Sequence, residues 1–152
     1  MNYEIINLQK KDIVGITART RNDDEKMGEI IGGLWSDLFN KGVLQNIGDK
    51  INNCTIGLYS GYENDEKSEY SITVGCEVKN ITNIPRGTVV KNIPEGKYAK
   101  FIVEGNMQTA VQEFWDKLWQ MPLDRKYSGD FEEYQPECTM KHAIIHIYIS
   151  IT

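Results

Sequence analysis

Two amphipathic segments of the chain carry the same aromatic pattern, and this repeat is the feature that most limits the available folds. Residues 33–39 read Gly-Leu-Trp-Ser-Asp-Leu-Phe, and residues 113–119 read Glu-Phe-Trp-Asp-Lys-Leu-Trp. Both place Trp, Leu and a terminal aromatic residue at the same offsets, with the spacing of a helix that packs on one side. Strand-like sequence surrounds each segment. We therefore expect a duplicated strand–helix–strand–strand unit, with halves at about residues 1–80 and 86–152.

Alternating apolar and polar residues predict half-buried antiparallel strands around these helices. The alternation is clearest in residues 54–60 and 70–79, and residues 62–69, which carry five charged side chains, are expected to form the solvated connection between them. Further strands are expected at residues 3–8, 12–20, 87–92, 97–103 and 143–151. Residues 131–134 are expected to lie in a loop. The sequence therefore predicts a single α+β domain with an antiparallel sheet, two main helices and a central cleft between the halves.

Composition excludes several classes of function. The net charge of −5 argues against a surface that follows nucleic-acid phosphates. The basic pairs Lys10-Lys11 and Arg125-Lys126 are short and isolated, so we expect them to be solvated. No apolar stretch is long enough to span a membrane, and the cysteines show no disulfide or metal-site spacing. We expect a cytoplasmic protein with no cofactor, no metal, no direct nucleic-acid contact and no membrane contact, and the sequence identifies no protein partner.

The tetrapeptide Phe131-Glu132-Glu133-Tyr134 is the most prominent candidate site, because it places two carboxylates between two aromatic rings. A carboxylate in a pocket walled by rings would attract an apolar cation. In the alternative interpretation, both acids are solvated and the rings only pack. If the segment is extended, Glu132 and Tyr134 share one face and Phe131 and Glu133 share the other, so only one acid can point inward.

Other aromatic residues could complete such a site. A buried carboxylate needs hydrogen-bond donors, which tyrosine hydroxyls can supply. The tryptophans offer stacking surfaces, although a Trp on the apolar face of a helix belongs to the core more often than to a ligand site. Besides the tetrapeptide, we expect the ligand-binding residues to include Trp35, Tyr59, Tyr70, Trp115 and Trp119.

A series of short motifs runs through the whole chain in a fixed order. They are residues 13–16 (Ile-Val-Gly-Ile), 34–35 (Leu-Trp), 57–65, 70–75, 93–99, 114–119, 131–134 and 147–151. This order resembles the GyrI-like family of effector-binding domains found in bacterial multidrug-sensing regulators. The resemblance implies a duplicated β-α-β-β fold around a cleft that binds hydrophobic, often cationic small molecules. In that family a glutamate of the Phe-Glu motif supplies the counter-charge, and by match to the motif this role falls on Glu132, with Glu133 as its competitor.

The chain departs from the family pattern in two respects. Ser150 stands where the family often has Pro, which bears on the edge geometry of the last strand. The chain also has no residues to spare for a DNA-binding module, so we expect a drug-binding or sensing protein that does not itself bind DNA.

The resemblance leaves two other functions open. Some GyrI-like proteins are reported to hydrolyse cyclopropane-bearing electrophilic toxins. In such an enzyme Glu132 would transfer the proton, with Tyr59 or Tyr134 assisting. A protein-inhibitor role, implied by the family name, has no specific patch in this sequence.

Overall fold

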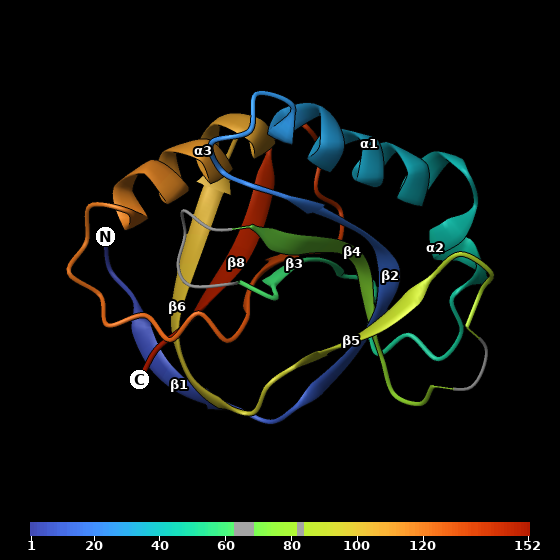
Figure 1. Ribbon diagram of the computed structural model, residues 1–152, viewed down its shortest axis with the longest axis horizontal. Helices are drawn as coiled ribbons and strands as arrows, with labels where there is room; N and C mark the ends of the chain where they lie inside the picture. Colours follow the sequence, from blue (N-terminus) through green and yellow to red (C-terminus); the bar gives the residue numbers. More distant parts are fainter. Residues whose placement is uncertain (63–68, 82–83) are drawn as a thin grey trace.

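The computed structural model describes residues 1–62, 69–81 and 84–152, and in these residues the strands form an eight-stranded antiparallel sheet (Figure 1). The strands are β1 (Glu4–Leu8), β2 (Lys11–Thr20), β3 (Thr55–Ser60), β4 (Tyr70–Val78), β5 (Val89–Ile93), β6 (Gly96–Gly105), β7 (Asp130–Tyr134) and β8 (Ala143–Ser150). The helices are α1 (Met27–Asn40), α2 (Val43–Asn46) and α3 (Met107–Leu118). Most of the predicted connection at residues 62–69 lies outside the described residues. No helix in the described part is long and apolar enough to cross a bilayer.

The order of strands in the sheet is β1-β6-β8-β7-β3-β4-β2-β5. Each half of the chain contributes one three-stranded block, β2-β4-β3 or β6-β8-β7, and the two blocks meet through the antiparallel pair β3–β7. The first strand of each half crosses to the other half, because β1 pairs with β6 and β5 pairs with β2. The predicted fold class, an α+β domain of two β-α-β-β units, is confirmed.

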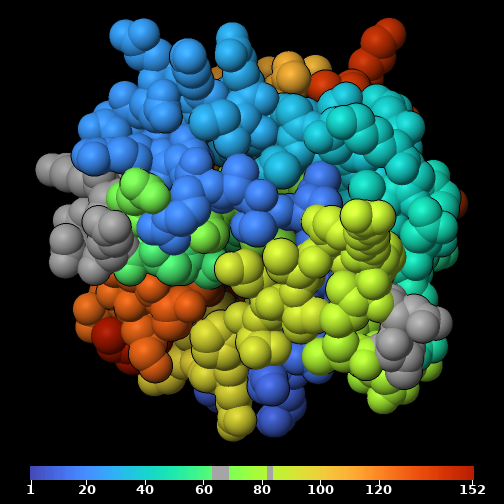
Figure 2. Space-filling view, turned by 45° about the vertical axis from the view of Figure 1, so that its right-hand side comes forward, coloured from blue at the N-terminus to red at the C-terminus, as the bar shows by residue number. Residues whose placement is uncertain are grey.

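Both long helices lie on the same face of the sheet, where they appear along the top of Figure 1. α3 packs on apolar residues of β6 and β8, and α1 packs on those of β4. The sheet curves around its opposite face. β1 and β2 lie near opposite ends of the strand order, but only a short connection joins them, so the two ends of the sheet come together. Ile6, Ile13 and Ile93 therefore pack in one cluster. Figure 2 shows the yellow-green β5 segment beside blue residues of the N-terminal half.

Two local predictions were wrong for reasons of tertiary structure. Residues 130–134 form strand β7 instead of a loop, because β3 and β8 pair with both of its edges. All nine residues of β4 are buried, instead of every second one. The strand lies in the interior of the sheet: its apolar residues pack in clusters on one face, and Ser71, Thr73 and Glu77 on the other face bond to side chains of β2. The short helix α2 was not predicted from the sequence. Its four residues are too few to show a helical pattern.

Gly15 and Gly75 lie opposite each other in the β2–β4 pair, and the two backbones approach closely there. A β-carbon on Gly15 would lie 2.1 Å from the carbonyl oxygen of Val74, and one on Gly75 would lie 2.0 Å from that of Val14. Each obstacle is backbone, which cannot rotate aside as a side chain can. Any residue other than glycine at either position therefore forces these two strands apart.

We expect Gly15→Ala to lower the free energy of unfolding by about 2 kcal/mol, the usual cost of forcing extra atoms into a packed interior. Urea denaturation followed by circular dichroism measures this change. Gly33→Ala is the matched control, because a β-carbon on exposed Gly33 in α1 meets no atom within 4 Å. The control should gain up to about 1 kcal/mol from helix propensity. Equal stability of Gly15→Ala and the wild type would contradict the close approach of β2 and β4.

Candidate ligand-binding site

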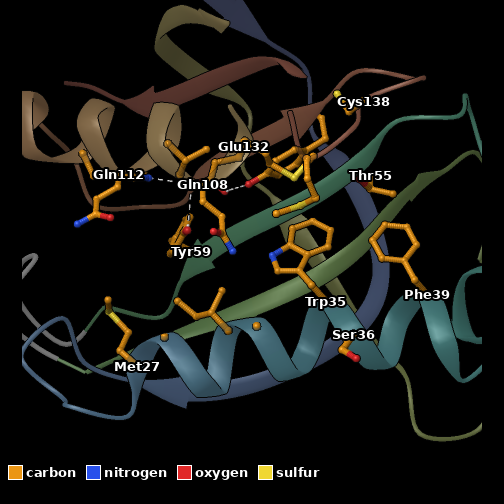
Figure 3. A pocket seen from close by; sticks show the side chains of 18 of the residues that line it. Met27, Trp35, Ser36, Phe39, Thr55, Tyr59, Gln108, Gln112, Glu132 and Cys138 are labelled. Atoms are coloured by element: carbon orange, nitrogen blue, oxygen red, sulfur yellow. Dashed lines mark hydrogen bonds between the residues drawn. The ribbon is translucent and has the colours of Figure 1, made fainter. Parts of the chain in front are cut away.

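A cavity of about 1100 Å³ lies between α1, α3 and the strands β3 and β7, and we call it the interhelical cavity. The apolar side chains that line it recur every fourth residue along each helix. In α1 they are Met27, Ile31, Trp35 and Phe39, and from α3 onward they are Met107, Val111, Trp115 and Trp119. The sheet contributes Thr55, Tyr59, Glu132 and Tyr134. Figure 3 shows Trp35 pointing from α1 toward the strands that carry Tyr59 and Glu132.

Glu132 is the charged residue in a row of otherwise apolar residues that runs across four neighbouring strands. In this row Val74, Gly57, Glu132 and Ile147 lie side by side on β4, β3, β7 and β8. Gly57 provides the space that the site needs. A β-carbon at Gly57 would lie 3.2 Å from Cζ2 of Trp35 and 3.4 Å from Oε1 of Glu132. The glycine therefore lets the Trp35 indole and the carboxylate approach the strand together.

The Glu132 carboxylate accepts three hydrogen bonds, and all three donors are neutral. The Tyr59 hydroxyl and the Trp115 indole N–H donate to Oε2 at 3.0 and 2.8 Å, and the Tyr134 hydroxyl donates to Oε1 at 2.8 Å. Glu132 is only 2% exposed. These bonds orient the carboxylate, but neutral donors do not cancel its charge.

Burial raises the pKa of Glu132 above its ordinary value, and the hydrogen bonds from Trp115, Tyr134 and Tyr59 act in the opposite direction without reversing the shift. The pKa of Tyr59 and that of Tyr134 lie well above the usual range, first because of burial and then because of the nearby Glu132 charge. Both hydroxyls therefore keep their protons at neutral pH and remain donors.

Asp130 is a second buried acid on the same face of β7, and it has a cationic partner. Its Oδ2 lies 2.7 Å from Nη2 of Arg125, and the two side chains are 0% and 7% exposed. The Ser150 N–H and hydroxyl donate to Oδ1, and the Tyr62 hydroxyl donates to Oδ2. Burial acts to lower the pKa of Arg125, but Asp130 outweighs it and the pKa is raised. The Arg125 guanidinium therefore keeps its proton beside Asp130.

The sequence analysis misplaced two residues of this ion-pair cluster. Arg125 was expected to be solvated, but its side chain is buried against Asp130 because the backbone of Arg125 pairs with Ile151 and holds it against the sheet. Ser150 was expected to affect an edge of the sheet. Instead it lies in β8, between β6 and β7, where its N–H donates to Asp130 as no proline could.

The structure brings seven of the nine predicted site residues together around the interhelical cavity and places two elsewhere. Those lining it are Trp35, Tyr59, Tyr70, Trp115, Trp119, Glu132 and Tyr134. Trp119 lies at the rim, with 46% of its surface exposed. Phe131 and Glu133 point to the opposite face of β7, as strand alternation requires. Phe131 stacks on Tyr148 with ring centroids 4.4 Å apart.

Glu133 has its own partners on that opposite face. Its Oε1 accepts a hydrogen bond from Nε2 of Gln135 at 3.0 Å and lies 3.7 Å from Nδ1 of His146.

Three residues near the cavity were missed by the sequence analysis: Gly57, Arg125 and Asp130. Of these three, only Gly57 could have been found from the sequence, because strand alternation puts it on the same face as Tyr59, a predicted site residue. Across residues 1–62, 69–81 and 84–152, no group of three His, Cys, Asp or Glu residues could hold a metal ion.

A family model described as "Cass2: Integron-associated effector binding protein" matches residues 4–151. The chain belongs to this family. An integron cassette protein from the mobile metagenome of Vibrio cholerae is 25% identical to this Cass2-family chain, with a TM-score of 0.78 over 99% of this chain and 95% of that one. The structure of SAV2435 bound to tetraphenylphosphonium is also 25% identical, with a TM-score of 0.78 over 100% of this chain and 94% of that one.

A sequence relative of the Cass2-family chain comes from Bacillus subtilis (strain 168). It is the "Putative transcriptional regulator protein YobU", which is 29% identical over 154 residues, or 97% of this chain and 96% of YobU. Together with the structural neighbours, this relative confirms the predicted relationship to effector-binding domains of the GyrI-like type.

The raised pKa of Glu132 predicts how stability depends on pH. The folded protein binds this proton more tightly than the unfolded chain, whose carboxyl titrates near the ordinary value of 4.5. The contribution of Glu132 to stability is therefore full below that value and is lost as the pH rises through the higher folded pKa. In Glu132→Gln this loss is absent. We expect the variant to gain stability relative to the wild type as the pH rises from about 4 to 8. Urea unfolding at several pH values measures the difference, and a difference that does not change with pH would contradict the shift.

Proposed function

We propose that the protein binds a hydrophobic, cationic small molecule in the interhelical cavity, with Glu132 as the counter-charge. Two comparisons support a small-molecule ligand. The family is described as effector-binding, and the similar protein SAV2435 was solved with tetraphenylphosphonium, a hydrophobic cation. The cavity, about 1100 Å³ and lined largely by apolar side chains, is slightly larger than the roughly 300–1,000 Å³ of most small-molecule sites.

The observation that carries the proposal is the missing counter-charge of Glu132. Within the described residues, none of the ion pairs involves this buried carboxylate, whereas Asp130 two residues away is paired with Arg125. An isolated buried charge is costly, so a ligand that brings a positive charge to Glu132 recovers electrostatic energy that a neutral ligand cannot. The site thus favours cations over neutral molecules of the same shape.

Aromatic rings surround the Glu132 carboxylate and would contact a hydrophobic cation. The rings of Tyr59 and Trp115 have centroids 5.2 Å apart, and those of Trp35 and Tyr134 are 5.1 Å apart. Three of these four rings donate hydrogen bonds to Glu132, and the fourth, Trp35, lies beside it across Gly57. Each cation–π contact contributes on the order of 0.5–2 kcal/mol. Binding of this kind would serve drug sensing or sequestration.

Hydrolysis of a cyclopropane-bearing electrophile is a second candidate function for the same site. The specific observation in its favour is that a buried acid of raised pKa bonds directly to two tyrosines. Glu132 could exchange a proton with a reacting group while Tyr59 or Tyr134 donates to it.

We expect Glu132→Gln to weaken the binding of tetraphenylphosphonium at least about tenfold, because the variant removes the counter-charge and keeps the shape of the side chain. Isothermal titration calorimetry measures the dissociation constants. Glu133→Gln is the matched control, since it removes the neighbouring charge on the opposite face of β7 and should leave affinity within about twofold of the wild type. Equal weakening by both variants, or by neither, would reject the proposed role of Glu132.

A test for catalytic turnover distinguishes a protein that only binds the compound from one that hydrolyses it. We expect a cyclopropane-bearing electrophile incubated with the protein to be recovered unchanged, with no more than one equivalent bound for each chain. Liquid chromatography with mass spectrometry of the recovered compound measures this directly. Conversion of several equivalents by the wild type, lost in Glu132→Gln, would instead establish the hydrolase.

A further inference from the structure

Arg125 is a buried cation with one unpaired buried hydrogen-bond donor. Its guanidinium carries five N–H donors, and among residues 1–62, 69–81 and 84–152 its one hydrogen bond joins Nη2 to Asp130. Nε is buried, and no atom in the described part of the chain accepts a hydrogen bond from it. Unpaired buried donors are rare in folded proteins because each one forfeits its bonds to water. The ion pair alone therefore does not account for an arginine at this position.

Arg125 also lines the interhelical cavity, close to the proposed cation site. Its Cζ lies 4.3 Å from the ring centroid of Tyr127 and 6.0 Å from that of Trp115. The same Trp115 indole donates its N–H to Glu132 at 2.8 Å. Arg125 and Glu132 thus share Trp115 as a neighbour, and both line the interhelical cavity.

We propose that Arg125 forms a second polar subsite, which binds a neutral carbonyl-type oxygen on the same molecule whose cationic centre lies at Glu132. This inference rests on the proposed function and narrows its ligand class to hydrophobic monocations that carry an oxygen acceptor. Nε itself is enclosed, so the acceptor would reach the guanidinium from the side of Arg125 that lines the cavity.

Charge balance selects a neutral acceptor rather than a carboxylate. With both carboxylates ionised, Glu132, Asp130 and Arg125 together carry one net negative charge, which a monocation neutralises. A carboxylate on the ligand would restore the buried negative charge, and its desolvation would offset its bond to Arg125. A carbonyl oxygen accepts the hydrogen bond without adding charge, and a bond to a charged donor is stronger than one to a neutral donor.

Two matched probes test the subsite. One is a triphenylphosphonium with a straight hexyl chain, and the other carries a chain of the same length with a ketone in place of one methylene. Titration calorimetry gives the ratio of their dissociation constants for the wild type and for Arg125→Gln/Asp130→Asn, a double variant that removes both charges together. We expect the preference for the ketone to fall at least about tenfold in the double variant. The same ratio in both proteins would overturn the subsite.

A third probe, with a carboxylate at the end of the chain, tests the charge argument. We expect wild-type protein to bind it more weakly than the ketone. A preference for the carboxylate that depends on Arg125 would overturn the assignment of a neutral acceptor. If neither the hexyl nor the ketone compound binds the wild type, the proposed function fails and this inference fails with it. Binding of the hexyl compound that depends on Glu132, with no effect of the ketone, overturns the inference alone.

Nuclear magnetic resonance of the wild type gives a second measurement if the double variant does not fold. The chain has four arginines, so their Nε–H signals can be assigned individually. We expect the Arg125 signal to shift with the ketone probe and to shift much less with the hexyl probe, whose chain has no acceptor. Identical shifts with both probes would overturn the subsite.

Discussion

The antiparallel pairing of β3 with β7 is the constraint on which the rest of the structure depends. It joins the two halves of the chain and sets Gly57 directly opposite Glu132. The missing side chain at Gly57 leaves room for Trp35 beside the carboxylate. The same register brings Tyr59 of the first half and Trp115 of the second half to the same oxygen of Glu132. One strand pair thus builds both the sheet and the polar centre of the cavity.

Two carboxylates on one face of β7 are stabilised in different ways, and this difference gives the site its chemistry. Asp130 receives a guanidinium and backbone and hydroxyl donors, so its charge is paired within the protein. Glu132 receives only hydroxyl and indole donors, which hold it in place and leave its charge unpaired. The first arrangement fixes the position of the strand. The second leaves the negative charge of Glu132 without a counter-charge, which a bound cation can supply.

Much of the site could be predicted from local pattern. Alternation in an extended segment separates Glu132 and Tyr134 from Phe131 and Glu133, and the resemblance to GyrI-like domains favours the first of these pairs. Trp35 and Trp115, which stand at equal offsets in α1 and α3, both line the cavity. Arg125 could not be predicted, because nothing in its neighbourhood in the sequence shows that Asp130 faces the interior. An arginine beside a lysine and near an aspartate is equally typical of a solvated loop.

The sequence by itself determined the repeat, the α+β class and the two faces of each strand, because these follow from the spacing of apolar residues over short distances. Only the tertiary structure decided which face of β7 meets the helices and which buried acid finds a cation. Those outcomes depend on partners that are remote in the chain, such as Tyr59, which lies 73 residues from Glu132. Local periodicity carries no information about such pairs, since the register between strands decides which side chains meet.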